Sequence, residues 1–513
     1  MLSKVYGAGI LGTDGYIVCC EADVGNGLPQ MTLIGYLSNA VKEAQDRVRT
    51  SIRNSGFALP PKRITINLSP ADIKKDGTGY DLPIAIALLV AYGYINDTLT
   101  KDALFAGELS LDGSLHPING ALSMVSEARN VGFKRCFLPM ENAQEGSCIE
   151  GIDCIGISSL KELIDILNGE ISLPEPILYS EDESELEYAM DMADINGQEF
   201  AKRAMVLSAA GRHNILLIGP AGTGKSMIAS RIPTILPLMT KQERLEVSKI
   251  YSVSGLLRPD MPLLKHRPFR DPHHTISPQA LAGGGTHPKP GEISLATHGV
   301  LFLDELPEFH SDTLEILRQP LEEKKIRITR LNGSFEYPAN FMLVCAMNPC
   351  KCGFYPDRSK CNCSEKQVRN YIGRISKPLL DRIDICIETS SVNYNDLRKK
   401  GDGTKSHEIR KKIEEIRAIQ AERFKSTRIR FNSEMSAKEV DEFCQITHED
   451  DEYLKEIYEK RSMSARGLHK ILKVARTIAD YEGCSDIKRI HLAEAVNYRS
   501  LEKKFWGARG FRV

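Results

Sequence analysis

One segment constrains this 513-residue chain more than any other: a glycine-rich turn directly after a short apolar run. Residues 214–226 read NILLIGPAGTGKS and fit the spacing G-x-x-x-x-G-K-S, in which small residues let successive backbone N–H groups surround phosphate oxygens. The flanking residues have the composition of a buried strand and of a helix start, whereas a chance glycine turn needs neither. The predicted nucleotide-binding residues are Gly219, Pro220, Ala221, Gly222, Thr223, Gly224, Lys225 and Ser226.

Charged residues make up 26% of the chain and hydrophobic residues 42%, which is a globular composition. No uninterrupted apolar run approaches the roughly 20 residues that cross a bilayer, and the first residues lack a signal-peptide pattern. We therefore expect a cytoplasmic protein that does not bind a membrane. Because the net charge is only −1, any affinity for nucleic acid must come from local basic surfaces.

The length suggests about three domains, and the sequence pattern changes along the chain accordingly. Residues 1–172 alternate strand-like and helical runs, which predicts an α/β domain with its own core. Residues 173–189 are rich in proline and then in acids, as in a linker. Residues 190–395 contain the phosphate loop and predict an αβα core, and residues 396–513 predict a helical domain. The expected fold class is therefore a multidomain α/β protein.

Two adjacent carboxylates end an apolar run about eighty residues after the loop lysine. The run VLFL at residues 300–303 predicts a buried strand, and Asp304 and Glu305 follow it. We expect Asp304 to hold Mg²⁺ together with Ser226, and Glu305 to orient and deprotonate the attacking water. Many strands end in acids at a loop, but this order after a phosphate loop is typical of a nucleotide hydrolase. The implied cofactors are ATP and Mg²⁺.

Two polar residues further along the chain fit the same chemistry. Asn348 follows the predicted strand 341–346 and can position the lytic water, although Asn-Pro is also an ordinary turn initiator. The segment around Arg382 resembles the part of AAA+ proteins in which an arginine reaches the γ-phosphate bound by the neighbouring subunit. A planar, always-charged guanidinium suits that role. A structural ion pair with Asp381 or Asp384 is the alternative.

Several longer motifs resemble the magnesium-chelatase-like AAA+ ATPases. They are GQ at 197–198, RPFRDPHH at 267–274, GEISLA at 291–296, LDELPEF at 303–309 and NPC at 348–350. Together with the N-terminal domain, they resemble the ComM (YifB) family over essentially the whole chain. That resemblance implies an AAA+ domain with a C-terminal helical lid. It further implies a homohexameric, ATP-driven DNA motor that promotes branch migration during natural transformation.

Two segments of the first domain resemble the proteolytic domain of Lon proteases, in which a lysine activates a serine nucleophile. These segments are residues 67–83 and 107–120. The nucleophile position holds Gly79, or Tyr80 if the alignment slips by one, and Thr78 is the only aliphatic hydroxyl nearby. The lysine position holds Leu122. We therefore expect a Lon-like domain without a catalytic dyad, acting as a scaffold or a nucleic-acid surface.

Two insertions support a nucleic-acid motor. Residues 264–290 form a basic, histidine-rich loop, and Asn332-Gly333 between two strand-like runs predicts a hairpin carrying Arg327 and Arg330. In related AAA+ groups these two elements face the central pore, so we expect them to contact DNA phosphates. A solvated basic surface is the alternative. The pair His273-His274 is a poor metal site, because adjacent residues in an extended loop rarely point the same way.

Four cysteines gather shortly after Asn348 in the pattern C-x-C, eight residues, C-x-C. They are Cys350, Cys352, Cys361 and Cys363. Four thiolates within fourteen residues can form a tetrahedral Zn²⁺ site, and reduced, unligated cysteines are the alternative. The place of the cluster between Asn348 and Arg382 favours a structural role near a subunit interface.

The C-terminal region resembles the helical lid of AAA+ proteins. Predicted helices span 407–424, 468–481 and 490–498. Arg466 occupies the place of an arginine that senses nucleotide, and a surface helix cap is the alternative. The basic, aromatic tail at 503–512 suits either single-stranded nucleic acid or a neighbouring subunit.

The sequence thus favours a hexameric ATPase that moves on single-stranded or branched DNA. An ATPase that remodels a protein partner, chelatase-like or chaperone-like and independent of DNA, is the alternative. An ATP-dependent peptidase is disfavoured by Gly79 and Leu122 at the dyad positions.

Overall fold

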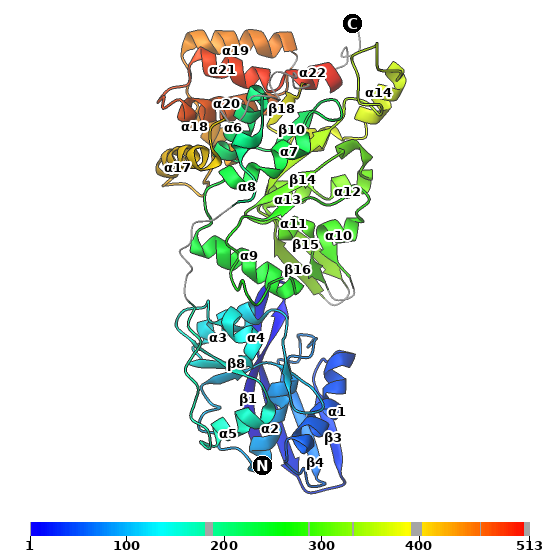
Figure 1. The fold of residues 1–513 in the computed structure, drawn as a ribbon, viewed down its shortest axis with the longest axis vertical. Coiled ribbons are helices and arrows are strands. Elements are labelled where there is room, and N and C mark those ends of the chain that lie inside the picture. Colours follow the sequence, from blue (N-terminus) through cyan, green and yellow to red (C-terminus); the bar gives the residue numbers. More distant parts are fainter. Residues whose placement is uncertain are drawn as a thin grey trace.

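The computed structural model describes residues 2–179, 188–285, 288–330, 333–390, 403–461 and 463–506. Two sheets and a group of helices follow one another along the longest axis of the molecule (Figure 1). The N-terminal sheet lies at one end, the sheet with the phosphate loop in the middle, and helices α17 to α22 near the other end. The expected mixture of α/β layers with a helical C-terminal region is confirmed.

The N-terminal sheet has seven strands in the order β3-β4-β2-β1-β5-β8-β9. Strand β1 is antiparallel to β2 and parallel to β5, so the sheet is mixed. The strands are β1 (Leu2–Leu11), β2 (Asp14–Gly25), β3 (Gln30–Ile34), β4 (Arg63–Ser69), β5 (Ala103–Phe105), β8 (Arg135–Pro139) and β9 (Asp153–Ile157), with β6 (Glu108–Leu109) and β7 (Leu115–His116) as a separate short pair.

The helices packed on this sheet are α1 (Asn39–Asn54), α2 (Asp81–Tyr92), α3 (Ala121–Val131), α4 (Met140–Gly146) and α5 (Leu160–Leu167). Helix α1 buries Val41, Ala44, Val48 and Ile52, whose spacing of three and four residues places them on one face. Helix α2 is buried from Asp81 to Ala91 and is apolar all round, as expected of a helix enclosed by the core. The buried carboxylate of Asp81 is compensated by an ion pair with Arg47, at 2.8 Å.

The second sheet has five parallel strands in the order β11-β14-β17-β10-β18. They are β11 (Phe269–Arg270), β14 (Val300–Leu303), β17 (Met342–Met347), β10 (Ile215–Ile218) and β18 (Ile385–Glu388). All residues of β10, β14 and β17 are buried, which explains their uninterrupted apolar sequences. Because the strands are parallel, their carboxyl ends share one edge of the sheet.

Short helices surround this sheet. They are α6 (Glu199–Gly211), α7 (Lys225–Ser230), α8 (Ile232–Ile235), α9 (Lys241–Ser254), α10 (Pro278–Ala282), α11 (Glu292–Leu295), α12 (Ser311–Glu315), α13 (Arg318–Glu323), α14 (Glu365–Ile372) and α15 (Lys377–Leu380). There are also two small antiparallel strand pairs: β12 (Gly283–Gly284) with β13 (Lys289–Pro290), and β15 (Lys325–Arg330) with β16 (Gly333–Pro338). The second pair extends toward the N-terminal sheet (Figure 1).

The β15–β16 hairpin confirms the sequence prediction but shifts its turn by one residue. Arg330 pairs with Gly333, so Gly333 belongs to strand β16 and not to the predicted Asn332-Gly333 turn. The connection itself lies outside the described residues. Gly333 has a φ of +137°, which lies in a region that L side chains rarely adopt.

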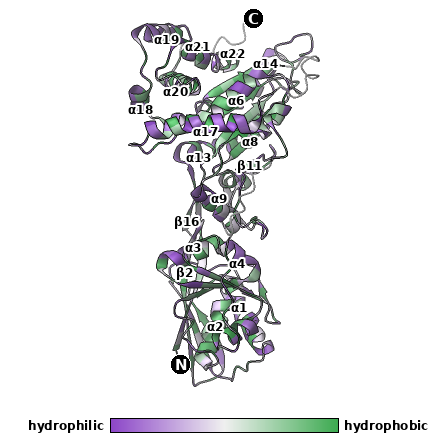
Figure 2. Cartoon of the chain, turned by 60° about the vertical axis from the view of Figure 1, so that its left-hand side comes forward, coloured by the Kyte–Doolittle hydropathy of each residue, from purple (hydrophilic) through white to green (hydrophobic). Residues whose placement is uncertain are grey.

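The C-terminal helices are α17 (Ser406–Arg423), α18 (Ala437–Phe443), α19 (His448–Arg461), α20 (Ala465–Tyr481), α21 (Arg489–Asn497) and α22 (Ser500–Trp506). Helix α20 begins three residues before the predicted start, because the hydroxyl of Ser464 caps it by accepting from the N–H of Gly467. Hydrophilic residues cover much of α17 in Figure 2. Among the described residues, no helix is both long and apolar enough to span a bilayer.

The N-terminal sheet region is joined to the second sheet region through α9. The buried carboxylate of Glu145 on α4 accepts hydrogen bonds from the N–H of Leu122 (2.9 Å) and from the hydroxyl of Ser252 on α9. Leu245 and Leu263 pack against the apolar cluster around α3 and α4. Burial raises the pKa of Glu145, and its hydrogen bonds oppose that rise. This carboxylate therefore connects three helices at the junction.

We expect Glu145→Ala to lower the free energy of unfolding by about 2–4 kcal/mol, because it leaves the Leu122 N–H and the Ser252 hydroxyl buried without an acceptor. Thermal unfolding of the full chain measures the effect as a lower midpoint. Glu141→Ala removes an exposed carboxylate from the same helix and serves as the control. Equal midpoints for the two variants would contradict the role of Glu145.

Candidate nucleotide-binding site

The phosphate loop connects the end of β10 to the start of α7. Gly222 and Gly224 have φ angles of +77° and +79°, a left-handed conformation that favours glycine. At Gly219, a Cβ atom would lie 2.5 Å from the backbone oxygen of Thr389, which follows the adjacent strand β18. The glycines of the motif are therefore required by backbone conformation at two positions and by close packing at the third.

Lys225 places its ammonium group at the centre of this loop. Its Nζ donates to the carbonyl oxygens of Gly219 and Pro220, both at 2.8 Å, and lies 3.2 Å from Oδ1 of Asn348. Burial lowers the pKa of Lys225, and the nearby carboxylates of Asp304 and Glu305 partly offset the shift. Because its hydrogen-bond partners are neutral, this buried cation favours an anionic ligand such as a phosphate group.

The expected magnesium ligands lie next to each other. The hydroxyl of Ser226, at the start of α7, donates to Oδ2 of Asp304 at 2.5 Å. The other carboxylate oxygen of Asp304 accepts from the N–H of Glu305 at 2.8 Å. A hydroxyl and a carboxylate at a phosphate loop are the hard oxygen ligands that Mg²⁺ prefers. These residues therefore fit a Mg²⁺ ion bound with the phosphates.

Glu305 adopts an unusual backbone conformation for its residue type. Its φ is +51°, a left-handed value that costs a non-glycine residue about 1–3 kcal/mol. Its carboxylate is half-exposed, and Oε2 lies 3.4 Å from Nδ1 of His274. This backbone conformation directs the carboxylate of Glu305 toward the loop that follows β11. The carboxylate therefore points away from the hydrogen-bonded pair Ser226 and Asp304.

His274 also belongs to the site, although the sequence did not predict its contact with Glu305. It lies four residues after β11, and β11 neighbours β14, so the loops after the two strands meet at the same sheet edge. The rings of His273 and His274 are 4.0 Å apart, and Nδ1 of His273 lies 2.9 Å from the hydroxyl of Thr275. Of the two adjacent histidines, His274 is the one that contacts Glu305. This contact follows from the order of the strands in the sheet, which short-range sequence does not give.

Arg382 lies at the opposite edge of the sheet. The side-chain amide of Asn214 donates to the carbonyl of Arg382 at 2.8 Å, and Asn214 immediately precedes β10. Because the four residues of β10 span about 13 Å, Arg382 cannot reach the phosphate loop of its own chain. Its guanidinium is held by Glu322 on α13 and by the carbonyl of Pro378 at 2.6 Å.

The alternative pairing of Arg382 with Asp381 or Asp384 is therefore not what the structure shows. Asp384 lies 3.3 Å from Nδ1 of His213 instead. Asp381 has Nη1 of Arg466 at 4.0 Å, and the side chain of Arg466 is 74% exposed. Arg466 thus lies beside the segment of Arg382, whereas Lys225, Ser226, Asp304, Glu305 and Asn348 gather at the other edge.

The arginines of the basic loop at 264–290 are less available for contacts with DNA phosphates than the composition of the loop suggested. Arg267 is buried, pairs with Glu243 at 3.0 Å and donates to the carbonyl of His298 at 2.6 Å. Arg270 forms two hydrogen bonds with Glu292, at 2.5 and 2.7 Å. The charges of these two arginines therefore stabilise contacts within the chain, and the contact of this loop with DNA phosphates stays a prediction.

The two hairpins nevertheless pack against each other. The hydroxyl of Tyr337 on β16 donates to the carbonyl of Pro288 at 2.7 Å, and a Cβ on Gly284 would lie 2.8 Å from Nη2 of Arg330. Arg327 stands directly opposite Glu336 and bonds to it at 3.0 Å. Among the described residues, the guanidinium of Arg330 bonds to the carbonyl of Thr329, which leaves its charge available at the hairpin tip.

The Lon-like segments come together around a cavity of about 540 Å³, whose lining includes Thr78, Gly79 and Glu108. The hydroxyl of Thr78 donates to the carboxylate of Glu108. Leu122 is buried in the apolar cluster around α3. At the dyad positions expected from the sequence, the structure thus has a glycine beside the cavity and a buried leucine, and neither side chain can supply a nucleophile or a base.

Comparison with family models gives three matches. The model described as magnesium chelatase, subunit ChlI, matches residues 191–397, and the model of its C-terminal part matches residues 403–499. A model described as subunit ChlI of Mg-chelatase matches residues 20–142. Matches to magnesium-chelatase models therefore extend over most of the chain.

Among known proteins, the competence protein ComM of Haemophilus influenzae is 41% identical over 506 residues, which is 98% of each chain. The chain belongs to the ComM (YifB) family. The uncharacterized protein YifB of Salmonella typhimurium is 39% identical over 505 residues and 98% of each chain. A Lon protease of Rhizobium meliloti is 26% identical over 175 residues, which is 32% of this chain and 21% of the protease. The resemblance of this chain to the magnesium-chelatase-like AAA+ ATPases is thereby confirmed.

We expect His274→Ala to lower the kcat of ATP hydrolysis about tenfold with little change in KM, since loss of one orienting contact to Glu305 costs about 1.4 kcal/mol. Steady-state hydrolysis rates measure the effect. His273→Ala is the matched control, because that ring contacts His274 and Thr275 and leaves the contact with Glu305 in place. Equal kcat values for both variants would show that His274 does not position Glu305.

Proposed function

We propose that this member of the ComM (YifB) family is the subunit of a hexameric ATPase that moves on single-stranded or branched DNA. The observation that carries the proposal is the separation of Arg382 from the phosphate loop across the second sheet. Since Arg382 cannot complete its own site, the complete site requires a neighbouring subunit. A closed ring provides one such neighbour for every subunit.

In this proposal, the residues at the carboxyl edge of the sheet carry out hydrolysis. Lys225 binds the β- and γ-phosphates through its ammonium group. Ser226 and Asp304 would hold Mg²⁺, which neutralises phosphate charge when bound. Glu305 orients and deprotonates the attacking water, with His274 holding its carboxylate, and Asn348 orients the γ-phosphate or the water through its amide.

The residues at the amino edge act on the neighbour's nucleotide. Arg382 leaves Glu322 and stabilises the charge that develops on the γ-phosphoryl group. Arg466 lies beside the same segment and is exposed, so we assign it to sensing that same nucleotide. Binding and hydrolysis would then be coupled to the relative movement of adjacent subunits and their lids.

DNA contact is assigned to the paired hairpins. Arg330 at the tip of the β15–β16 hairpin carries an available charge, and Lys289 lies on the neighbouring hairpin. Contacts with phosphates from such positions do not depend on base sequence. Because the competence protein ComM matches 98% of this chain, we propose branch migration or strand extension during natural transformation or recombination, in the cytoplasm.

We also propose a domain division to go with this function. Residues 1–172 form a Lon-like domain without peptidase activity, residues 173–189 a linker, residues 190–395 the ATPase domain and residues 396–513 the lid. The contacts of Glu145 with Ser252 support a fixed scaffold role for the first domain.

One observation favours the second candidate, an ATPase that remodels a protein partner. Arg267, Arg270 and Arg327 all pair with carboxylates of their own chain, and the net charge is −1. Three of the arginines in the described parts of the two insertions are therefore already engaged within the chain. In this alternative, ATP hydrolysis would not respond to DNA.

We expect single-stranded and forked DNA to increase the rate of ATP hydrolysis several-fold, and Arg330→Glu to remove that increase while leaving the basal rate unchanged. Lys455→Glu reverses an exposed charge on α19, remote from the hairpins, and serves as the matched control. Lys225→Ala gives the background rate of ATP hydrolysis when the nucleotide site is disabled. If the wild-type chain showed no stimulation and no strand movement, the remodelling function would replace the DNA motor.

We expect Arg382→Ala to bind ATP but to hydrolyse it at least about 100-fold more slowly, as for the loss of other arginine fingers. Mixing these subunits with Lys225→Ala subunits restores part of the rate, because the second variant still offers Arg382 to its neighbour. In the control, Arg382→Ala subunits are mixed with the Lys225→Ala, Arg382→Ala double variant, and we expect no recovery of the hydrolysis rate. A mixed rate no greater than the sum of the separate rates would refute the shared site.

A further inference from the structure

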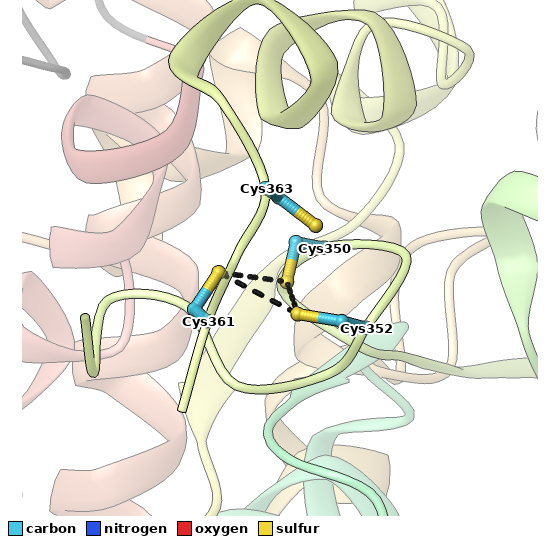
Figure 3. A group of neighbouring side chains, drawn as sticks. All are labelled: Cys350, Cys352, Cys361 and Cys363. Atoms are coloured by element: carbon cyan, nitrogen blue, oxygen red, sulfur yellow. Dashed lines mark hydrogen bonds between the residues drawn. The ribbon is translucent and has the colours of Figure 1, made fainter. Parts of the chain in front are cut away.

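The four cysteines after β17 converge on one point, as Figure 3 shows. Cys350 Sγ lies 3.3 Å from that of Cys352 and 3.7 Å from that of Cys361, and Cys352 and Cys361 are 3.5 Å apart. All four sulfur atoms, including that of Cys363, lie within 4.8 Å of one another. No other group of three or more ligand side chains meets this condition in the described part of the chain.

These distances match a single metal ion better than a disulfide. A disulfide joins two sulfur atoms at about 2.05 Å, far below the shortest separation here. Four thiolates at about 2.3 Å from a central Zn²⁺ ion lie about 3.8 Å from one another in a tetrahedron. Cys350 and Cys361 are buried, so the ion would be enclosed by protein on one side.

We propose that Cys350, Cys352, Cys361 and Cys363 bind one Zn²⁺ ion, which fixes the segment between Asn348 and α14 against the nucleotide site. Four cysteine ligands complete a tetrahedral shell and leave no position for water or substrate, so the role is structural. This inference does not depend on the proposed movement on DNA.

On one side, the cysteine loop touches the phosphate loop. Cys350 lies two residues after Asn348, whose amide oxygen contacts Lys225. Gly353 has a φ of +87°, and a Cβ there would lie 3.5 Å from the backbone nitrogen of Ala221. A metal ion that holds Cys350 and Cys352 therefore also fixes the position of Asn348 and the wall of the phosphate loop.

On the other side, the cysteine loop packs against the C-terminal helix α22. The ring of Tyr355 lies 6.5 Å from that of Phe505, and both belong to the apolar cluster that contains Cys350 and Cys361. The indole N–H of Trp506 donates to the carbonyl of Ile372 at 3.4 Å. Cys363 precedes Ser364, which caps α14 through the N–H of Gln367. The zinc site would thus join the ATPase core to the last described helix.

Metal analysis of the full chain, purified without chelator or added metal, tests the site. We expect one Zn²⁺ per chain, and well under half of that in Cys352→Ser, whose exposed position makes misfolding a small risk. Cys484→Ser alters a cysteine outside the cluster and should retain one Zn²⁺. Well under one Zn²⁺ in the wild-type chain, iron in its place, or full zinc in Cys352→Ser would overturn the proposal.

Trp506 provides a second readout, because it is the only tryptophan in the chain. We expect removal of zinc with a thiol-modifying reagent and a chelator to shift its fluorescence emission to longer wavelength, as α22 loses its support. The same treatment of Cys352→Ser should cause a much smaller shift than in the wild-type chain. Release of one Zn²⁺ without any shift would overturn the claim that the ion fixes this region.

Discussion

The buried ammonium of Lys225 is the interaction on which the nucleotide site depends. Its hydrogen-bond partners are neutral oxygens from the phosphate loop and from Asn348 at the end of the adjacent strand. A cation in such surroundings is poised for phosphate, because phosphate oxygens supply the negative charge that the protein partners lack. The parallel sheet makes this arrangement possible, since it brings the ends of β10, β14 and β17 to one edge.

The same sheet separates Lys225 from Arg382, and we assign these two residues to different halves of the proposed site. The edge with Lys225 holds the groups to which we assign phosphate and metal binding, whereas Arg382 lies beside Asn214, just before the start of β10. Direct contact between these halves within one chain is prevented by the length of β10. Because Arg382 lies far from Lys225, an isolated subunit has an incomplete site. In the proposed ring, the rate of hydrolysis would therefore depend on the position of the neighbouring subunit.

Local motifs predicted the phosphate loop, Asp304 and Asn348. Each of them directly follows a strongly apolar strand, so its place can be predicted from short-range sequence. The contacts of His274 with Glu305, of Arg382 with Glu322 and of Arg267 with Glu243 were not predictable in this way. These contacts join residues that lie far apart in the sequence. The composition of a loop shows that it is basic, but it does not show which acidic residues pair with it. The turn of the β15–β16 hairpin was shifted by one residue, since register is set by both strands.

The β15–β16 hairpin also meets the turn between β1 and β2. A Cβ on Gly12 would lie 3.2 Å from the carbonyl oxygen of Glu336, and the adjoining cavity is lined by residues of both regions. A hairpin supported in this way cannot tilt freely about its base. In the proposed motor, any movement of its tip would either push the N-terminal sheet or slide along it. In the proposed motor, the first domain would then limit how far the hairpin can move, which is a role that needs no catalytic residues.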